Sequence, residues 1–374
     1  MTAQEIIFTM ALTRIPRLSL VSSRMLYDAM GSATAVFEHR KHIRDAVPDA
    51  TDKLVEVLQD VDEALDVAKK EYEFAEKKHI RCLCFDDEAY PLLLKECPDA
   101  PLVLYYLGNA DLNAQHIVSV VGTRNITPMG KDVCRTFIAD LQKAYPDTLI
   151  VSGLAYGVDV HAHRAALENG MNTLGVLAHG LDTIYPALHR TTAAKMVQRG
   201  GLLTEYMSNT RPDKGNFVRR NRIVAGMSQC TIVVESAAKG GALITAELAN
   251  DYNREVCAFP GRPYDEYSKG CNQLIAHNKA RLITCLDDFL EAMDWQNPLA
   301  KKTQLVQQEL FPDVSDDEQK IIDSLRNVEN KHINQIAIDT NINVGKVTSA
   351  LFEMELKGIV EMLGGARCRL KLRR

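Results

Sequence analysis

Three short glycine-rich segments each follow a predicted buried strand, and charged side chains stand beside them. They are GTRN at 122–125, SGLAYG at 152–157 and ESAAKGG at 235–241. Glycine lets the backbone approach a ligand closely and frees N–H groups to face an anion at the start of the next helix. Arg124 and Lys239 add full positive charges to these segments. The pattern predicts an anion-binding edge.

A basic run with one aromatic residue precedes the fifth strand of the predicted sheet. Within 211–222 the single acid Asp213 stands against five cations, Arg211, Lys214, Arg219, Arg220 and Arg222. The chain position of this run places it at the opposite, amino edge of the sheet unless the preceding segment folds back. We expect the long loop over 207–218 to bring Phe217 and Arg219 or Arg220 to the anion-binding edge.

The type of anion follows from the motifs that the chain lacks and from Phe217. GTRN is not GxGxxG, no acid follows at the spacing that holds the ribose of NAD, and neither GxxxxGK[ST] nor GxSxG occurs. Several anion pockets suit a repeating phosphate backbone better than one mononucleotide. An aromatic ring beside arginines is a usual stacking surface for unpaired bases. The pattern favours a single-stranded nucleic acid, bound with strong salt dependence.

Short apolar strands alternate with helices from residue 117 onward. The predicted strands are IVSVVG (117–122), TLIVSG (148–153), NTLGVLA (172–178), GLLTEY (201–206), CTIVVES (230–236), VCAFPG (256–261) and ARLIT (280–284). Nearly continuous apolar strands separated by amphipathic helices indicate a Rossmann-like α/β fold with a doubly wound parallel sheet. Such sheets bind ligands beyond the carboxyl ends of their strands, where the glycine-rich segments lie.

A helical region precedes the sheet and a smaller domain follows it. Residues 1–80 are predicted to be helical, and the Rossmann-like domain covers 81–295 with an extended lead-in over 81–110. Residues 296–314 are polar and aperiodic, which indicates a linker. Residues 315–374 give three helices and a hairpin about Gly364-Gly365, the pattern of a winged helix.

The composition is that of an ordinary globular protein. The 374 residues are 46% hydrophobic and 25% charged, with a net charge of −5. The nine cysteines contain no CxxC pair, so we expect reduced thiols and no metal site. The N-terminal stretch lacks a signal-peptide pattern, and no apolar run reaches the roughly 20 residues that span a bilayer. We expect a cytoplasmic protein without membrane contact.

Seven segments, in order and spacing, resemble the motif series of the DNA-processing protein A (DprA/Smf) family. They are VVGTRNITPMG (120–130), IVSGLAYGVDVHAHRAALENG (150–170), LAHGLDTIYPALH (177–189), GGLLTEY (200–206), FVRRNRIVAGMS (217–228), VVESAAKGGALITAELA (233–249) and AFPGRPYDEYSKGCNQLI (258–275). The resemblance implies a non-enzymatic homodimer, without a cofactor, that binds and protects single-stranded DNA. It also implies loading of the RecA recombinase during natural transformation, or competence, and DNA recombination.

The positions that match the family imply a DNA-binding set without a catalytic residue. Phosphate contact is implied for Gly122, Arg124, Ser152, Gly153, Arg220 and Lys239, and base stacking for Phe217. Lys214, Arg219, Arg222 and Gly240 complete the candidate set. Glu235 also matches, and we expect it to support the fold because a carboxylate would repel phosphates.

Two alternative functions stay open at this point. RRNRIV followed by GGALITAE, which ends in Glu247, resembles the nucleoside-monophosphate phosphoribohydrolases, whose loop is PGGxGTxxE. Here Lys239 stands in place of the proline and Ala242 in place of a glycine. The other alternative is a winged-helix transcription regulator whose Rossmann-like domain senses a ligand.

The terminal regions and the linker suggest further partners. The segment 12–38 resembles a helix-hairpin-helix-like module but carries Arg17-Leu18-Ser19 in place of Gly-Ile-Gly, which favours a scaffold or partner-docking role. The candidate recognition helix over 343–357 has only two lysines against two glutamates, so we expect protein interaction or auxiliary DNA contact. In the linker, QQELF (307–311) resembles a sliding-clamp peptide.

Overall fold

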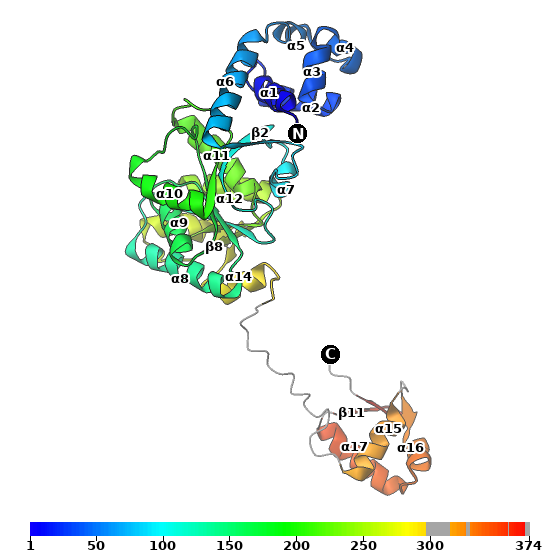
Figure 1. Cartoon of the computed structure of the whole chain (residues 1–374). Helices are drawn as coiled ribbons and strands as arrows, with labels where there is room; N and C mark the ends of the chain where they lie inside the picture. The colour runs from blue at the N-terminus through cyan, green and yellow to red at the C-terminus, as the bar shows by residue number, and fades with distance from the viewer. Residues whose placement is uncertain (297–314, 327–329, 358, 371–374) are drawn as a thin grey trace. The chain divides into compact units, whose positions relative to one another are not determined.

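The computed structural model describes residues 1–296, 315–326, 330–357 and 359–370. The chain divides into two compact units, one within 1–298 and the other within 299–374 (Figure 1). The larger unit holds the N-terminal helices and the sheet, and the smaller unit is the winged helix. The predicted linker over 296–314 and its QQELF segment lie outside the described residues except for Gln296.

The first 80 residues are helical, as the sequence predicts. The helices are α1 (Ala3–Leu12), α2 (Leu20–Met30), α3 (Ala33–His39), η1 (Arg40–His42), α4 (Ile43–Ala46), α5 (Asp52–Val57) and α6 (Asp62–Lys78). Their buried apolar side chains, such as Leu12 and Leu26, belong to the same hydrophobic core as Leu83 and Tyr105 of the first two strands. The helical region and the sheet therefore form one packed body.

Nine strands form the large sheet. They are β1 (Arg81–Cys84), β2 (Val103–Gly108), β3 (Ile117–Val121), β4 (Leu149–Ser152), β5 (Thr173–Val176), β6 (Gly200–Thr204), β7 (Cys230–Val233), β8 (Glu255–Ala258) and β9 (Arg281–Leu282). Each of the seven predicted strands is present. The lead-in contributes β1 and β2, with α7 (Leu92–Lys95) between them.

The order of the strands creates a switch point beside β3. The order is β1-β2-β6-β5-β4-β3-β7-β8-β9. Strands β3 to β9 are parallel, and β2 is antiparallel to both of its neighbours, β1 and β6. The chain runs outward from β3 to β6, then returns to place β7 on the other side of β3. Ligands of open parallel sheets bind at such a reversal, beyond the carboxyl ends of the strands.

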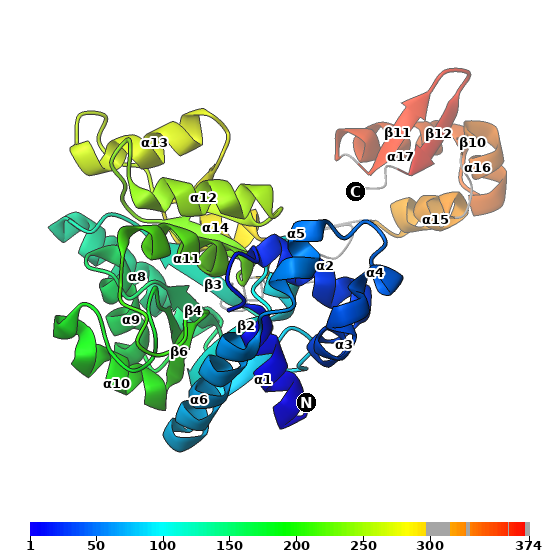
Figure 2. The ribbon, with the colours of Figure 1, turned by 90° about the horizontal axis from the view of Figure 1, so that it is seen from above.

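Helices cover both faces of the sheet (Figure 2). They are α8 (Pro128–Ala144), α9 (Val158–Glu168), η2 (Ala187–His189), α10 (Arg190–Gln198), α11 (Lys214–Gly226), α12 (Gly241–Asp251), η3 (Glu266–Ser268), α13 (Lys269–Ala276) and α14 (Leu286–Ala292). Apolar side chains of α8, α9 and α14 form one core with alternate strand residues such as Val118 and Ile232. Side chains of α11, α12 and α13 cover the other face, over Val121 and Val233.

The smaller unit is a winged helix, as predicted. It contains α15 (Asp316–Leu325), α16 (Ile333–Thr340), α17 (Val344–Leu356) and a three-stranded sheet of β10 (Lys331–His332), β11 (Val360–Leu363) and β12 (Arg367–Leu370). A capping box of Ser315 and Glu318 begins α15. The unit has its own core, which includes Ile322, Leu351 and Cys368.

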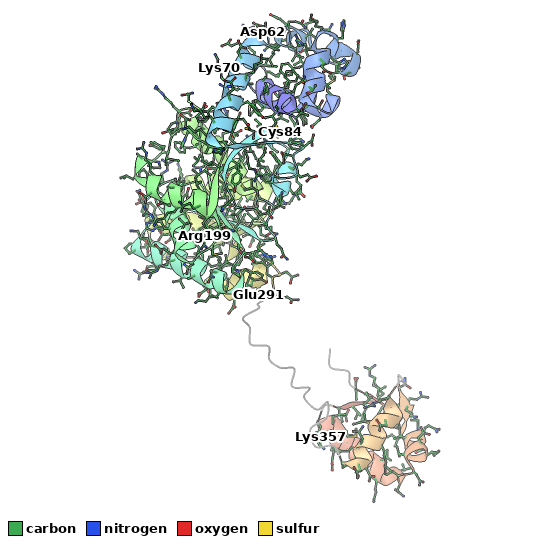
Figure 3. All side chains as sticks on the ribbon, viewed as in Figure 1. Asp62, Lys70, Cys84, Arg199, Glu291 and Lys357 are labelled. Carbon is green, nitrogen blue, oxygen red and sulfur yellow. The ribbon has the colours of Figure 1, made fainter. Side chains whose placement is uncertain are left out.

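All nine cysteines lie within the described residues and none is in a disulfide. Most of them, such as the labelled Cys84, are buried (Figure 3). The described helices include none long and apolar enough to cross a membrane. In the same part of the chain, no three His, Cys, Asp or Glu side chains gather as a metal site would require.

Candidate nucleic-acid interface

A cavity of about 600 Å³ opens at the carboxyl edge of the sheet, at the switch point between β3 and β7. The loops after β3, β4 and β7 line it together with the first turns of α11 and α12. From the predicted set it brings together Gly122, Arg124, Gly153, Lys214, Phe217, Arg220 and Gly240. The glycine-rich segments that the sequence singles out thus meet in one place.

Backbone hydrogen bonds join the loops of this cavity to one another. The N–H of Thr123 donates to the carbonyl of Glu235 at 2.7 Å, and the carbonyl of Thr123 accepts from the N–H of Val158 at 3.1 Å. Gly157 permits this approach, because its φ is 78° and a Cβ there would lie 2.1 Å from the Thr123 carbonyl oxygen. The loop after β3 is therefore fixed between its two neighbours.

The N-terminus of α12 faces the cavity without a capping side chain. Gly240 is its N-cap residue and makes no side-chain capping bond, and Gly240, Gly241 and Ala242 all line the cavity. The first N–H groups of a helix carry partial positive charge and attract anions. Because an open cavity lies in front of them, these groups can hold a phosphate.

Phe217 and two neighbours form a stacking surface at the cavity. The guanidinium carbon of Arg124 lies 5.3 Å from the centroid of the Phe217 ring, and the Tyr185 ring lies 5.8 Å from it on a tilted plane. Arg124 is exposed, so its charge is available to a ligand. A base stacked on these rings would leave its phosphate within reach of a cation.

Arg220 forms part of the cavity floor, and the fold already uses its guanidinium. The side chain is 4% exposed and donates from Nη1 to the carbonyls of Gly153, at 2.6 Å, and of Val176. A Cβ at Gly153 would lie 2.2 Å from that same nitrogen, so any other residue there would displace the guanidinium. Asp159 lies on the same floor. Burial raises its pKa, and the charge of Arg220 opposes that rise.

Part of the basic run reaches the carboxyl edge because its residues from Lys214 onward belong to α11 rather than to a long loop. The predicted loop over 207–218 ends at Asp213, whose carboxylate accepts from the N–H groups of Gly215 and Asn216 and so caps α11. A helix that follows a parallel strand begins at the carboxyl edge. For this reason Lys214 and Phe217, in the first turns of α11, lie at the cavity.

Four residues of the predicted set lie outside the cavity lining. Ser152 is buried and donates to the Val120 carbonyl at 2.6 Å. Arg222 is buried, forms an ion pair with Glu205 and donates to the carbonyl of Asp99, so it supports the fold. Arg219 and Lys239 are exposed beside the lining residues Arg220 and Gly240. DNA contact by these four stays a prediction.

Glu235 holds the start of α8. Its carboxylate accepts from the N–H of Thr127 at 2.9 Å and from the Thr127 hydroxyl at 2.5 Å. It is 6% exposed and does not line the cavity. The structural role expected from the sequence agrees with this position.

Tyr185 is the lining aromatic that sequence reasoning missed. It lies in the segment LAHGLDTIYPALH, far along the chain from the strand ends that guided the search, and it is 48% exposed. A tyrosine directly before a proline, inside a family motif, was the signal available in the sequence. Asp159 and Asp213 also line the cavity, so its lining carries three cations and two acids.

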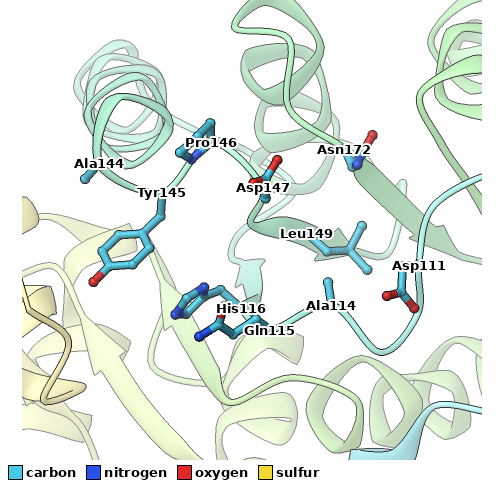
Figure 4. Close-up of a pocket in the computed structure, with 10 residues that line it drawn as sticks. All are labelled: Asp111, Ala114, Gln115, His116, Ala144, Tyr145, Pro146, Asp147, Leu149 and Asn172. Carbon is cyan, nitrogen blue, oxygen red and sulfur yellow. The ribbon is translucent and has the colours of Figure 1, made fainter. Parts of the chain in front are cut away.

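A second cavity, of about 480 Å³, opens at the opposite, amino edge of the same sheet (Figure 4). It lies at the starts of β3 and β4 and beside the C-terminal end of α8. His116, Tyr145 and Asn172 line it together with two carboxylates, Asp111 and Asp147. Among its described lining residues there is no lysine or arginine.

The fold and the site define a Rossmann-like protein whose carboxyl-edge cavity is lined by glycines, cations and two aromatic rings. The family model described as DNA recombination-mediator protein A matches residues 81–294, and the model of the DprA winged helix domain matches residues 307–366. The first match alone covers more than half of the chain. The chain belongs to the DprA/Smf family of DNA-processing proteins.

Relatives agree in sequence and in structure. Protein Smf of Synechocystis is 33% identical over 327 residues, which are 78% of this chain and 80% of that protein. A putative DNA processing protein DprA of Mycobacterium tuberculosis is 34% identical over 314 residues, 80% of each chain. The structure of DprA from Streptococcus pneumoniae superposes with a TM-score of 0.65 at 31% identity, covering 76% of this chain and 97% of that chain.

A solved structure from Helicobacter pylori concerns a related protein and its binding of single-stranded DNA. DNA processing protein A of that organism superposes with a TM-score of 0.52 at 30% identity, covering 59% of this chain and 99% of that chain. The structure is described as giving insight into a single-stranded DNA binding mode of that protein.

Proposed function

We propose that this protein binds single-stranded DNA in the carboxyl-edge cavity, without regard to base sequence. One observation carries the proposal: the Phe217 ring lies near both the Arg124 guanidinium and the Tyr185 ring, at a cavity that the uncapped N-terminus of α12 also faces. A phosphate takes the helix N-terminus and the cations, and an unpaired base takes the aromatic surface. A base inside a duplex has no free face to offer such a ring.

The single-stranded DNA binding described for the Helicobacter pylori protein supports this assignment. By the same family membership we infer that the chain forms a homodimer, acts in the cytoplasm, protects incoming DNA and loads RecA in natural transformation. These finer roles rest on the resemblance. A test of the last role is whether the chain speeds RecA filament growth on single strands.

We also propose that the chain is a binding protein and not a phosphoribohydrolase. The carboxylate that a phosphoribohydrolase would need, by the resemblance of its loop, is Glu247. That side chain is exposed, pairs with Lys279 at 3.2 Å and is absent from the cavity lining. Incubation with nucleoside monophosphates is expected to release no free base, and release would instead support the hydrolase.

The proposal is tested by fluorescence anisotropy with an oligo-dT and a duplex of equal length, each at two salt concentrations. We expect tighter binding of the single strand and a steep loss of affinity with salt, because cations replace the counterions of the DNA. Equal affinity for the duplex would support the transcription-regulator alternative and contradict the proposal.

Arg124→Ala and Arg199→Ala form a matched pair for the same measurement. Both side chains are exposed arginines of the larger unit, but Arg199 directly precedes β6 and so lies at the amino edge. Arg124→Ala is expected to weaken oligo-dT binding and to reduce the salt slope by about 1, as loss of one phosphate contact does. Arg199→Ala should leave both unchanged. Equal effects of the two changes would mean that the DNA does not bind at the carboxyl edge.

A further inference from the structure

The outward side of α17 ends in two large hydrocarbon side chains. Phe352 is 62% exposed and Leu356 is 76% exposed, one turn apart, whereas Val347, Leu351 and Met354 on the opposite side fill the core. A winged helix that reads DNA with this helix needs cations and hydrogen-bonding groups on its outward side. Phe352 and Leu356 offer an apolar ridge instead.

One flank of α17 borders a hollow. The hollow measures about 390 Å³ and lies between α15 and α17. Its lining combines apolar and charged residues, namely Ser315, Asp317, Glu318, Ile321, Ile342, Gly345, Lys346, Ser349, Ala350 and Glu353. Gly345 has no side chain, and the atom nearest to a Cβ placed there would be Asn343 Oδ1 at 3.3 Å. One helix therefore carries a ridge near its C-terminal end and, along one flank, a hollow that extends from Gly345 to Glu353.

We propose that α17 is a self-association surface, which binds α17 of a second copy of this chain in antiparallel orientation. In a two-fold interface each residue meets one that lies equally far from the midpoint on the other side. With the midpoint near residue 350, Leu356 comes opposite Gly345 and Phe352 opposite Ser349. The ridge of each copy then enters the hollow of the other, and both apolar ends leave water.

The charges on the flank of α17 fit the same arrangement. Lys346 and Glu353 are both exposed, lie two turns apart, and line the same side of the hollow. The midpoint between them is also close to residue 350. In the antiparallel pair Lys346 of each copy therefore faces Glu353 of the other, which gives two opposite-charge contacts. A parallel two-fold pair would place the two copies of this flank on opposite sides of the interface, so Lys346 of one copy would not meet Glu353 of the other.

The size of the surface sets the strength of the contact. A single pair of thirteen-residue helices buries less than the roughly 1,200 Å² typical of stable interfaces. We therefore expect weak association that depends on protein concentration. In a chain that also dimerises elsewhere, this contact would join dimers into larger assemblies.

Sedimentation velocity of the full chain over a concentration series tests the proposal. The test variant is Phe352→Glu, and the matched control is Ile338→Glu, which changes an exposed apolar residue (71%) of α16 in the same domain. At the highest concentration the wild type and the control should reach about twice the weight-average mass of Phe352→Glu. Identical masses for all three proteins would overturn the proposal, and so would a loss of duplex binding by Phe352→Glu at unchanged mass.

A charge exchange tests the antiparallel register without relying on Phe352. Lys346→Glu and Glu353→Lys should each associate roughly five-fold more weakly than wild type, because each creates two like-charge contacts. A mixture of the two variants restores both pairs and should sediment as the wild type does. A mixture that stays as weak as its components would overturn the register. Oligo-dT affinity is expected to be unchanged in these variants, so this result is independent of the proposed function.

Discussion

The two cavities at opposite edges of the sheet use the same strands but have opposite electrostatic surroundings. At the carboxyl edge, β3 and β4 end in glycine-rich loops, α12 presents its N-terminus, and three cations outnumber two acids in the cavity lining. At the amino edge, α8 presents its C-terminal end, and the charged lining residues are Asp111 and Asp147 (Figure 4). Helix ends contribute about half a charge each, positive at the N-terminus and negative at the C-terminus.

The comparison teaches that the direction of the strands in a parallel sheet already determines which edge attracts an anion. Every helix that follows a parallel strand begins at the carboxyl edge, so partial positive charge collects there and partial negative charge collects at the other edge. The side chains reinforce this difference. Each prediction below acts on one of the two edges or on the layer that supports them.

The largest effect is a loss of stability in Arg220→Ala, because the Arg220 guanidinium is buried and forms hydrogen bonds within the fold. The change leaves the carbonyls of Gly153 and Val176 without their donor and Asp159 without its nearby positive charge. Loss of such a buried partner costs about 3–5 kcal/mol of unfolding free energy. Urea denaturation measures it. The exposed neighbour Arg219 provides the control, since Arg219→Ala should shift stability by about 0.5 kcal/mol or less.

Phe217→Ala is expected to cost about 1–3 kcal/mol of DNA-binding free energy, or up to about 100-fold in affinity for oligo-dT. The reason is the loss of the aromatic ring that lies beside Arg124 and Tyr185. Anisotropy with oligo-dT measures it, with Tyr264→Ala as the control because Tyr264 is 94% exposed and lies outside the cavity lining. Phe217→Tyr should retain binding. An unaffected Phe217→Ala would remove base stacking from the proposal.

Acidification should destabilise the layer beneath the carboxyl edge through His163. This side chain of α9 is fully buried, its Nδ1 lies 2.7 Å from the Thr173 hydroxyl, and burial lowers its pKa to about 3. Below the ordinary histidine pKa of about 6.5 the unfolded chain takes up a proton that the folded chain does not, so stability falls with pH. Between pH 8 and pH 5 the loss is about 2 kcal/mol.

Denaturation curves at pH 8 and pH 5, measured for wild type and for variants, isolate the contribution of His163 to the pH dependence of stability. The loss should be smaller in His163→Gln than in wild type by the amount that His163 contributes. Burial also lowers the pKa of His116 in the amino-edge cavity, but that residue is only half-buried. His116→Gln should therefore change the pH dependence less. An equal change in both variants would contradict the assignment to His163.

The smallest effect is expected at the amino edge. Asp147→Lys places a cation beside the second cavity, but the C-terminal end of α8 and Asp111 stay there. We expect oligo-dT affinity to change by less than about two-fold, since one exposed charge contributes little. A clear gain of affinity would mean that charge alone, without helix N-termini, creates the binding edge.

The sequence predicted the sheet well, because its strands are buried on both faces and carry nearly unbroken apolar runs. The meeting of Gly122, Gly153 and Gly240 at one edge also followed, since topology alone brings strand ends together. The state of each cation did not follow. Both Arg124 and Arg220 are arginines for which the family motifs imply phosphate contact. In the structure Arg124 is exposed, whereas Arg220 is buried because α11 packs against Gly153.

Two further features could not be deduced from local patterns. The position of Tyr185 depends on a tertiary contact between the segment after β5 and α11, which no period in the sequence encodes. The loop predicted over 207–218 is shorter because Asp213 caps α11 and begins the helix at Lys214. The packing of the N-terminal helices into the same core as β1 and β2 was likewise invisible before the fold was known.

The hydrogen bonds that hold Thr123 to Glu235 on one side and to Val158 on the other have a kinetic consequence. A rim that is already assembled loses little conformational entropy when it captures a ligand, so nearly all of the ordering cost falls on the flexible polynucleotide. Capture should then proceed in a single step whose rate is set by diffusion and long-range attraction rather than by loop rearrangement.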